Sequence, residues 1–233
     1  MNTILITGAN RGIGLEMAKQ YSQDGWQVLA CCRKISNVNN LQELAHSTNN
    51  QVKIFQLDVV DDKSVHALAQ QIKDTPVDIL MNNAGVYGPQ EATFGSVSNV
   101  ATAWLNVFNI NAISPLRIAE AFLKNVTNSR VKIIANMSSA MGSIAENAEG
   151  KNYIYRSSKA ALNAVTKSLA LDLQPHGVTV VSLHPGWVQT DMGGPNALLD
   201  VQTSVQGIKK VLSTLSLKDT GNFLRYDGAA IAW

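Results

Sequence analysis

Two residues that could transfer a proton, Tyr155 and Lys159, lie four positions apart in a stretch with a helical pattern. Side chains at i and i+4 share one face of a helix, so the phenol and the ammonium would be neighbours. A tyrosine has an ordinary pKa of about 10, and an adjacent cation favours its ionised form. The pair therefore predicts acid–base chemistry. The spacing also occurs by chance, as a surface lysine beside a half-buried tyrosine, so other features have to decide between the two interpretations.

A glycine-rich turn near the N-terminus is the second such feature. Gly8, Gly12 and Gly14 follow the apolar run of residues 4–6 and precede a helical pattern. Glycine lets the backbone turn tightly and approach a ligand closely, and a helix that begins there directs free N–H groups at an anion. The turn therefore predicts a pyrophosphate site, although its G-x-x-x-G-x-G spacing differs from the commoner G-x-G-x-x-G of dinucleotide-binding proteins.

Short apolar runs alternate with helical patterns along the chain. The expected strands lie near residues 3–7, 27–32, 53–58, 79–82, 132–136, 179–183 and 222–225. The expected helices cover residues 13–24, 41–45, 64–73, 97–124 with an interruption near Pro115, 155–173 and 201–215. Continuously apolar strands are buried on both faces, which is typical of parallel sheets covered by helices. The pattern predicts an α/β fold, with a doubly wound, mostly parallel seven-stranded sheet and helices on both faces.

In such sheets, ligands bind beyond the carboxyl ends of the strands. Polar or glycine-containing segments follow six of the expected strands: Thr7-Gly8, Arg33, Asp58, Asn83-Ala84-Gly85, Ser138-Ser139 and Pro185-Gly186. Their convergence at one edge predicts a nucleotide site.

Composition narrows the function classes. With 233 residues, of which 45% are hydrophobic and 15% charged, we expect one domain covering residues 1–233. A net charge of +2 does not indicate nucleic-acid binding. The apolar runs are too short to span a membrane, and Met1 leads directly into the first strand, so we expect a cytoplasmic protein. Neither the adjacent Cys31 and Cys32 nor the scattered histidines have metal-site spacing, so no metal is expected.

These motifs resemble the short-chain dehydrogenase/reductase family over nearly the whole chain. The resemblance rests on T-G-x-x-x-G-x-G at residues 7–14, N-N-A-G at 82–85, the Ser139, Tyr155 and Lys159 set, and Pro185-Gly186. The segments 184–194 and 221–233 are similar to the C-factor and sniffer-type carbonyl reductase subgroup. The resemblance implies a Rossmann-type fold and reversible hydride transfer between a nicotinamide cofactor and a carbonyl or alcohol substrate.

The resemblance also implies four catalytic residues. Tyr155 would exchange a proton with the substrate oxygen, and Lys159 would lower the pKa of Tyr155 and bind the nicotinamide ribose. Ser139 would hydrogen-bond the substrate oxygen, with Ser138 as the alternative. Asn111 would hold a water that links Lys159 to solvent. The interval between Ser139 and Tyr155 is about three residues longer than the family pattern, with residues 145–150 as the extra loop.

The expected cofactor is NADP(H). An acidic residue at the end of the second strand would favour NAD, whereas this chain has Arg33 there and Arg11 in the glycine turn, and two guanidinium groups could hold a 2′-phosphate. The alternative, which the sequence favours less, is that Arg33 simply points to solvent. The cofactor-binding residues implied in total are Gly8, Asn10, Arg11, Gly12, Ile13, Gly14, Arg33, Asp58, Val59, Asn83, Ala84, Gly85, Tyr155, Lys159, Pro185, Gly186, Val188 and Thr190.

Several of these residues have an equally plausible structural role. Asp58 and Thr190 could cap turns, and Asn83 and Gly85 suit strand-end turns generally. Trp104, Trp187 and Met192 are candidates for the substrate pocket, or simply pack.

Two functions remain open. The first is an NADPH-dependent carbonyl reductase, and the second is a nucleotide-binding signalling protein of the C-factor type with little or no turnover. The resemblance further implies a homodimer or homotetramer that pairs through helices at residues 100–124 and 155–173.

Overall fold

The computed structural model describes residues 1–36, 38–49, 51–89, 94–96 and 100–233. Within these ranges seven strands form one sheet in the order β3-β2-β1-β4-β5-β6-β7, and every neighbouring pair is parallel. The strands are β1 (Thr3–Thr7), β2 (Gln27–Cys32), β3 (Val52–Gln56), β4 (Ile79–Asn82), β5 (Ile133–Met137), β6 (Thr179–His184) and β7 (Phe223–Arg225). The expected α/β architecture is confirmed, with a sheet that is entirely parallel.

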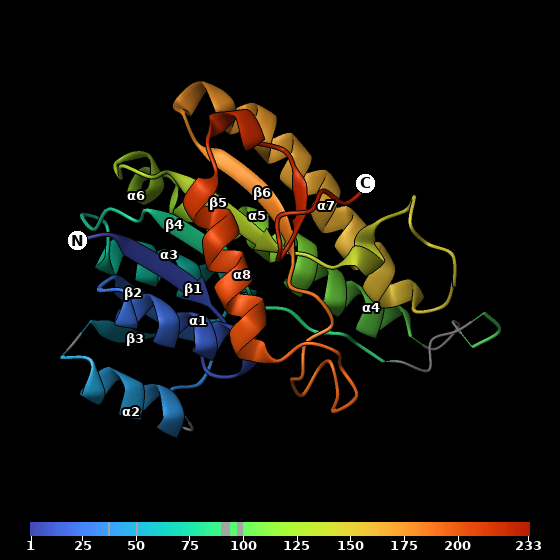
Figure 1. The fold of residues 1–233 in the computed structure, drawn as a ribbon, viewed down its shortest axis with the longest axis horizontal. Coiled ribbons are helices and arrows are strands. Elements are labelled where there is room, and N and C mark those ends of the chain that lie inside the picture. The colour runs from blue at the N-terminus through green and yellow to red at the C-terminus, as the bar shows by residue number, and fades with distance from the viewer. Residues whose placement is uncertain (37, 50, 90–93, 97–99) are drawn as a thin grey trace.

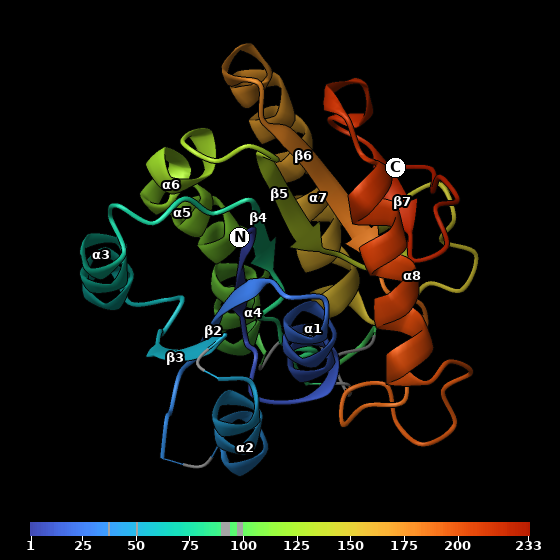
Figure 2. The same cartoon turned by 60° about the vertical axis from the view of Figure 1, so that its left-hand side comes forward.

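Helices cover both faces of the sheet (Figures 1 and 2). The helices are α1 (Gly12–Gln23), α2 (Asn39–Ser47), α3 (Asp62–Gln71), α4 (Ala101–Phe108), α5 (Ser114–Ala121), α6 (Leu123–Thr127), α7 (Tyr153–Leu173) and α8 (Val201–Thr214). On one face α1, α2 and α8 pack against the sheet, and on the other α3, α5 and α7 do so. Successive β1 residues alternate between these faces, since Ile4 and Ile6 join the first core and Leu5 the second. Continuous apolar strands are the sequence consequence of this double burial.

Several strand and helix boundaries lie one or two residues from the expected positions. β3 ends at Gln56, so Asp58 lies in the turn beyond it. Lys132 has a φ of 57°, a left-handed conformation incompatible with a strand, and β5 therefore begins at Ile133. Residue 97, where the long helical stretch was expected to begin, lies outside the described ranges.

The interruption near Pro115 has a different form from the one expected. A π-helical turn, η2 (Asn109–Ile113), joins α4 to α5 without a break. Pro115 is the second residue after this π-helical turn, and within a continuous helical segment it has no backbone N–H to donate to the preceding turn. π-Helical turns inside longer helices occur frequently at functional sites.

The strand order reverses direction between β1 and β4, which is where parallel sheets of this kind bind ligands. The segments that follow these two strands are in contact, because a Cβ added to Gly8 would lie 3.0 Å from the Cα of Ala84. Across the described ranges, no helix is both long and apolar enough to cross a bilayer.

Candidate active site

Tyr155, Lys159 and Ser139 meet at the carboxyl end of β5. Tyr155 and Lys159 are on the first two turns of α7, and Ser139 precedes a short 3₁₀ turn, η3 (Ala140–Gly142). All three residues are buried, with exposed fractions of 8%, 4% and 8%. The Ser139 hydroxyl lies close enough to the Tyr155 phenol to lower the pKa of that phenol. Two hydroxyls on separate elements therefore converge on one point, as stabilisation of a carbonyl oxygen requires.

Lys159 is held beside this pair by the sheet. Its ammonium Nζ donates to the Met137 carbonyl oxygen at 2.7 Å and lies 5.7 Å from the centroid of the Tyr155 ring. Burial lowers the pKa of Lys159 from 10.5 to about 8, because the charged form loses hydration. At neutral pH the lysine therefore still carries a proton.

The pKa of Tyr155 moves in the direction opposite to the expected one. Burial raises it from 10.0 to about 12, the hydrogen bond with Ser139 lowers it, and Tyr87 raises it. Lys159 is not among the groups that shift this pKa: its ammonium is directed to the Met137 carbonyl, and desolvation of the phenol is the largest cause. Tyr155 therefore keeps its proton at neutral pH, which suits a proton donor.

The two candidate serines have different partners. The Ser138 hydroxyl donates to Asn163 Oδ1 at 2.7 Å and so ties β5 to α7. The Ser139 hydroxyl accepts from the Met141 backbone N–H at 3.2 Å and faces Tyr155. The geometry places Ser139, as preferred from the sequence, next to the tyrosine.

Asn111 lies in the π-helical turn η2 with 1% of its surface exposed. Its Oδ1 accepts from the Val86 N–H at 2.9 Å, and its Nδ2 donates to the Val86 carbonyl at 2.8 Å and to Ser158 Oγ at 3.0 Å. The side chain thus fastens the segment after β4 to α7. Its water-holding role stays a prediction.

The glycine turn is braced by the segment after β4. The Thr7 hydroxyl accepts from the backbone N–H groups of Asn83 and Ala84, both at 3.0 Å. The Asn83 amide donates to the Thr7 and Gly8 carbonyls at 2.9 and 3.2 Å. A Cβ at Gly14 would lie 2.6 Å from Asn83 Nδ2 and would also collide with the Gly8 carbonyl oxygen. Asn83 therefore has the structural role that was one of its two alternatives.

The two arginines considered for a 2′-phosphate are both exposed. Arg33 follows β2 and projects from the carboxyl edge of the sheet. Arg11, at the N-cap of α1, forms an ion pair with Asp191, with 2.6 Å between Nη1 and Oδ2. The ion pair joins the glycine turn to the segment after β6. Thr190 in this segment is also close to the glycine turn, because a Cβ added at Gly12 would lie 3.4 Å from Thr190 Cγ2.

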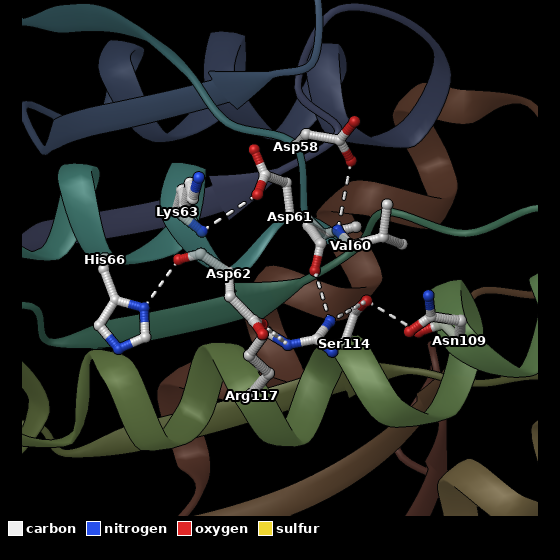
Figure 3. Close-up of polar contacts among 10 residues, drawn as sticks. Asp58, Val60, Asp61, Asp62, Lys63, His66, Asn109, Ser114 and Arg117 are labelled. Carbon is white, nitrogen blue, oxygen red and sulfur yellow. Dashed lines mark hydrogen bonds and ion pairs between the residues drawn. The ribbon is translucent and has the colours of Figure 1, made fainter.

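Asp58 and Val59, expected to contact adenine, follow the end of β3. Figure 3 shows Asp58 in a hydrogen-bonded turn. The Asp58 carboxylate accepts from the Val60 N–H at 3.2 Å, which is the turn-capping alternative. Arg117 on α5 donates to the Val59 carbonyl at 3.1 Å and forms an ion pair with Asp62 at the start of α3. This turn is therefore fixed to the second layer of helices, and the adenine contact stays a prediction.

The segment after β6 is closed on itself by hydrogen bonds. A bridge pairs Val188 with Leu199, and the Thr190 hydroxyl accepts from the Gly193 N–H at 3.1 Å, so Thr190 caps a turn. The indole N–H of Trp187 donates to the Gly193 carbonyl at 2.8 Å. Pro185 and Gly186 lead into this segment. Trp187 and Met192 are 53% and 46% exposed and are therefore available to a substrate.

Trp104, Tyr87 and the loop at residues 145–150 also have contacts that bear on the sequence predictions. The indole N–H of Trp104 donates to Ser157 Oγ at 3.0 Å, so Trp104 packs α4 on α7. Tyr87, two residues after the N-N-A-G motif, stacks on Tyr155 and was not predicted, although its position relative to that motif could have indicated it. The loop at residues 145–150 begins with an N–H that donates to the Trp233 main-chain oxygen at 3.1 Å.

Comparisons with known proteins agree with this geometry. Residues 2–198 match the family described as short chain dehydrogenase. The chain is 43% identical to the C-signal protein of Myxococcus xanthus over 169 residues, which cover 72% of this chain and all of that protein. It superposes on the carbonyl reductase Sniffer of D. melanogaster with a TM-score of 0.91 at 36% identity, covering 100% of both chains. The NADPH-bound carbonyl reductase from chicken fatty liver gives a TM-score of 0.90 at 36% identity, covering 100% of this chain and 99% of that one. The chain belongs to the short-chain dehydrogenase/reductase family of oxidoreductases.

Proposed function

We propose that this protein is an NADP(H)-dependent carbonyl reductase that converts an aldehyde or ketone into an alcohol. The observation that carries the proposal is the buried, protonated Tyr155 phenol beside the Ser139 hydroxyl, with Lys159 one helical turn further along α7. A phenol with a pKa of about 12 is protonated at neutral pH, so it can donate the proton that carbonyl reduction requires.

Each of these side chains has a definite task. Tyr155 donates its proton to the substrate oxygen, and Ser139 hydrogen-bonds the same oxygen as negative charge develops there. Lys159, charged at neutral pH and held by the Met137 carbonyl, has ammonium hydrogens left for ribose hydroxyls and favours the phenolate once the proton has gone. NADPH supplies the hydride when bound. Asn111 keeps the segment after β4 in place and, in this proposal, holds a water near Lys159.

The residues present fit a dinucleotide. A side chain at Gly14 would collide with the Gly8 carbonyl, so the turn is packed around the absence of a Cβ, and α1 begins directly behind it. A helix N-terminus of this kind attracts a pyrophosphate. Arg33, exposed beyond β2, is available to a 2′-phosphate, which favours NADP(H) over NAD(H). Two solved carbonyl reductases that resemble this chain, from chicken fatty liver and from Pseudomonas aeruginosa, contain NADPH or NADP.

We further propose that the chain forms one NAD(P)-binding domain, resides in the cytoplasm, and pairs into a homodimer or homotetramer through α4, α5 and α7. Large apolar side chains on these helices support the pairing: Leu105 is 73% exposed, Leu116 41% and Leu171 59%. Exposed apolar side chains on neighbouring helices are typical of an interface. A charged replacement, Leu105→Glu, is expected to reduce the mass measured by light scattering during gel filtration.

A signalling role is the second candidate, and the observation in its favour is the 43% identity to C-signal. The two functions predict different behaviour of Tyr155→Phe. If the protein acts by turnover, this variant loses any cellular effect while still binding NADPH. If it acts by binding alone, the effect survives.

The test of the reductase is loss of absorbance by NADPH and, in parallel, by NADH over a panel of aldehydes, α-diketones and quinones. We expect turnover that prefers NADPH and is lost in Tyr155→Phe. Binding of NADPH without turnover on any member of the panel would contradict the proposal and favour the signalling role.

A further inference from the structure

Tyr87 lies directly against Tyr155, although none of the roles assigned above uses it. The two ring centroids are 4.3 Å apart and the ring planes differ by 16°, so the phenols are stacked. This inference rests on the proposed function, in which Tyr155 is the proton donor. A ring covering one face of that donor restricts both the orientation of the phenol and the access of water to it.

The backbone on either side of Tyr87 is fixed. Val86, the preceding residue, exchanges two hydrogen bonds with the Asn111 side chain at 2.9 and 2.8 Å. Gly88, the following residue, has a φ of 82°, and a Cβ there would lie 2.8 Å from Val107 Cγ2. The position therefore accepts little besides glycine, and the Tyr87 ring starts from a rigid base.

The hydroxyl end of Tyr87 is also held. It lies 3.8 Å from the Met141 sulfur, within range of a weak hydrogen bond. The backbone N–H of Met141 in turn donates to Ser139 Oγ at 3.2 Å. Tyr87 thus contacts Tyr155 through its ring face and, at its other end, the short turn that carries Ser139.

We propose that Tyr87 is a positioning residue for Tyr155, whose stacked ring fixes the phenol toward Ser139 and keeps water from one of its faces. The groups that face Tyr155 are Lys159 from the same helix, Ser139 from the turn after β5, and Tyr87 from the segment after β4. Arg156, next to Tyr155 in sequence, acts on Tyr87 and lowers the pKa of that phenol, while burial raises it.

Replacement of Tyr87 separates the ring from its hydroxyl. Tyr87→Phe keeps the stack and is expected to retain kcat within about threefold, with only a small shift of the pH profile because the electrostatic effect of the second phenol is lost. Tyr87→Leu removes the stack, so kcat for reduction should fall roughly tenfold with little change in KM. Water reaching Tyr155 would also lower its pKa, so the alkaline limb of the kcat/KM profile should move to lower pH. The matched control is Tyr153→Leu, which removes a tyrosine that is 39% exposed from α7, the helix that carries Tyr155.

Two results would overturn the proposal. One is a Tyr87→Leu enzyme with wild-type kcat and pH profile. The other is a Tyr87→Phe enzyme as impaired as Tyr87→Leu, since the hydroxyl rather than the stacked ring would then matter. If Tyr87→Leu does not fold, Tyr87→Met, which keeps more volume without a ring, carries the same expectations.

A second measurement does not depend on turnover. The chain has five tyrosines, so ring-labelled protein gives five ¹³Cζ signals that single phenylalanine replacements assign. The titration midpoint of the Tyr155 signal should fall further in Tyr87→Leu than in Tyr87→Phe, which removes only the electrostatic effect of the second phenol. A wild-type enzyme that reduces no carbonyl compound would count against the proposed function, whereas an unmoved Tyr155 midpoint in Tyr87→Leu would count against the positioning role.

Discussion

Replacing Lys159 by methionine should stabilise the protein while abolishing its activity. The lysine is 4% exposed, and its pKa falls from 10.5 to about 8 on burial. This difference means that holding the protonated lysine inside the fold costs about 3 kcal/mol at pH 7. Methionine has a similar length and no charge, but it leaves the Met137 carbonyl without its 2.7 Å donor. Loss of this hydrogen bond costs about 1–2 kcal/mol of stability, so Lys159→Met is expected to raise the free energy of unfolding by about 1–2 kcal/mol at pH 7.

The pH dependence of this gain has a definite sign. Between pH 8 and 10.5 the unfolded wild-type chain binds more protons at Lys159 than the folded chain does, so wild-type stability rises with pH in this window. The cost of the buried charge falls from about 3 kcal/mol at pH 7 to about 1 kcal/mol at pH 9.5. The advantage of Lys159→Met should therefore shrink by about 2 kcal/mol and essentially vanish at pH 9.5.

Urea unfolding at pH 7 and pH 9.5, followed by circular dichroism without added nucleotide, measures this difference. Lys167→Met, which removes an exposed lysine from the same helix, is the matched control and should show no comparable pH dependence. A Lys159→Met protein that is less stable than wild type at pH 7 would refute the reasoning. So would a gain in stability that is the same at both pH values.

Three further predictions concern the cofactor site. Arg33→Glu should reduce the preference for NADPH over NADH by roughly tenfold or more in fluorescence titrations, because a carboxylate repels a 2′-phosphate. An unchanged ratio of the two affinities would mean that Arg33 does not bind the 2′-phosphate. Gly14→Ala should weaken binding of both nucleotides or lower the unfolding temperature, because the added methyl group collides with the Gly8 carbonyl. A variant with the wild-type unfolding temperature in calorimetry and wild-type nucleotide affinities would contradict the prediction. Asp191→Asn should break the ion pair with Arg11 and so free the guanidinium for a 2′-phosphate. The affinity for NADPH should then rise roughly two- to fivefold, with the affinity for NADH unchanged. Weaker binding of both nucleotides would mean that the ion pair is needed in the nucleotide-bound protein.

Much of the fold was predictable because its physical causes are local. β1 reads as a continuous apolar run because Leu5 faces one helical layer while Ile4 and Ile6 face the other. The glycine turn was recognisable because the close approach of Gly14 to the preceding backbone admits no side chain. Tyr155 and Lys159 could be paired because helical spacing alone puts them on one face.

Features that depend on distant partners were not predictable. The pKa of Tyr155 was expected to fall because Lys159 is visible in the sequence, whereas the burial of the phenol, which raises the pKa, is not. Arg11 was assigned to a phosphate, and its ion pair with Asp191 joins residues 180 positions apart. Tyr87 was passed over because stacking on Tyr155 depends on how the segment after β4 meets α7.

Transfer of deuterium tests the central claim most directly. The protein would be given NADPH labelled with deuterium at both C4 positions together with the best carbonyl compound of the panel, and the product analysed by mass spectrometry. We predict an alcohol that carries one deuterium on the former carbonyl carbon, formed by wild type and lost in Tyr155→Phe. NADPH binding with no labelled alcohol from any carbonyl compound, or label transfer undiminished in Tyr155→Phe, would contradict the assignment of Tyr155 as the proton donor of a carbonyl reductase.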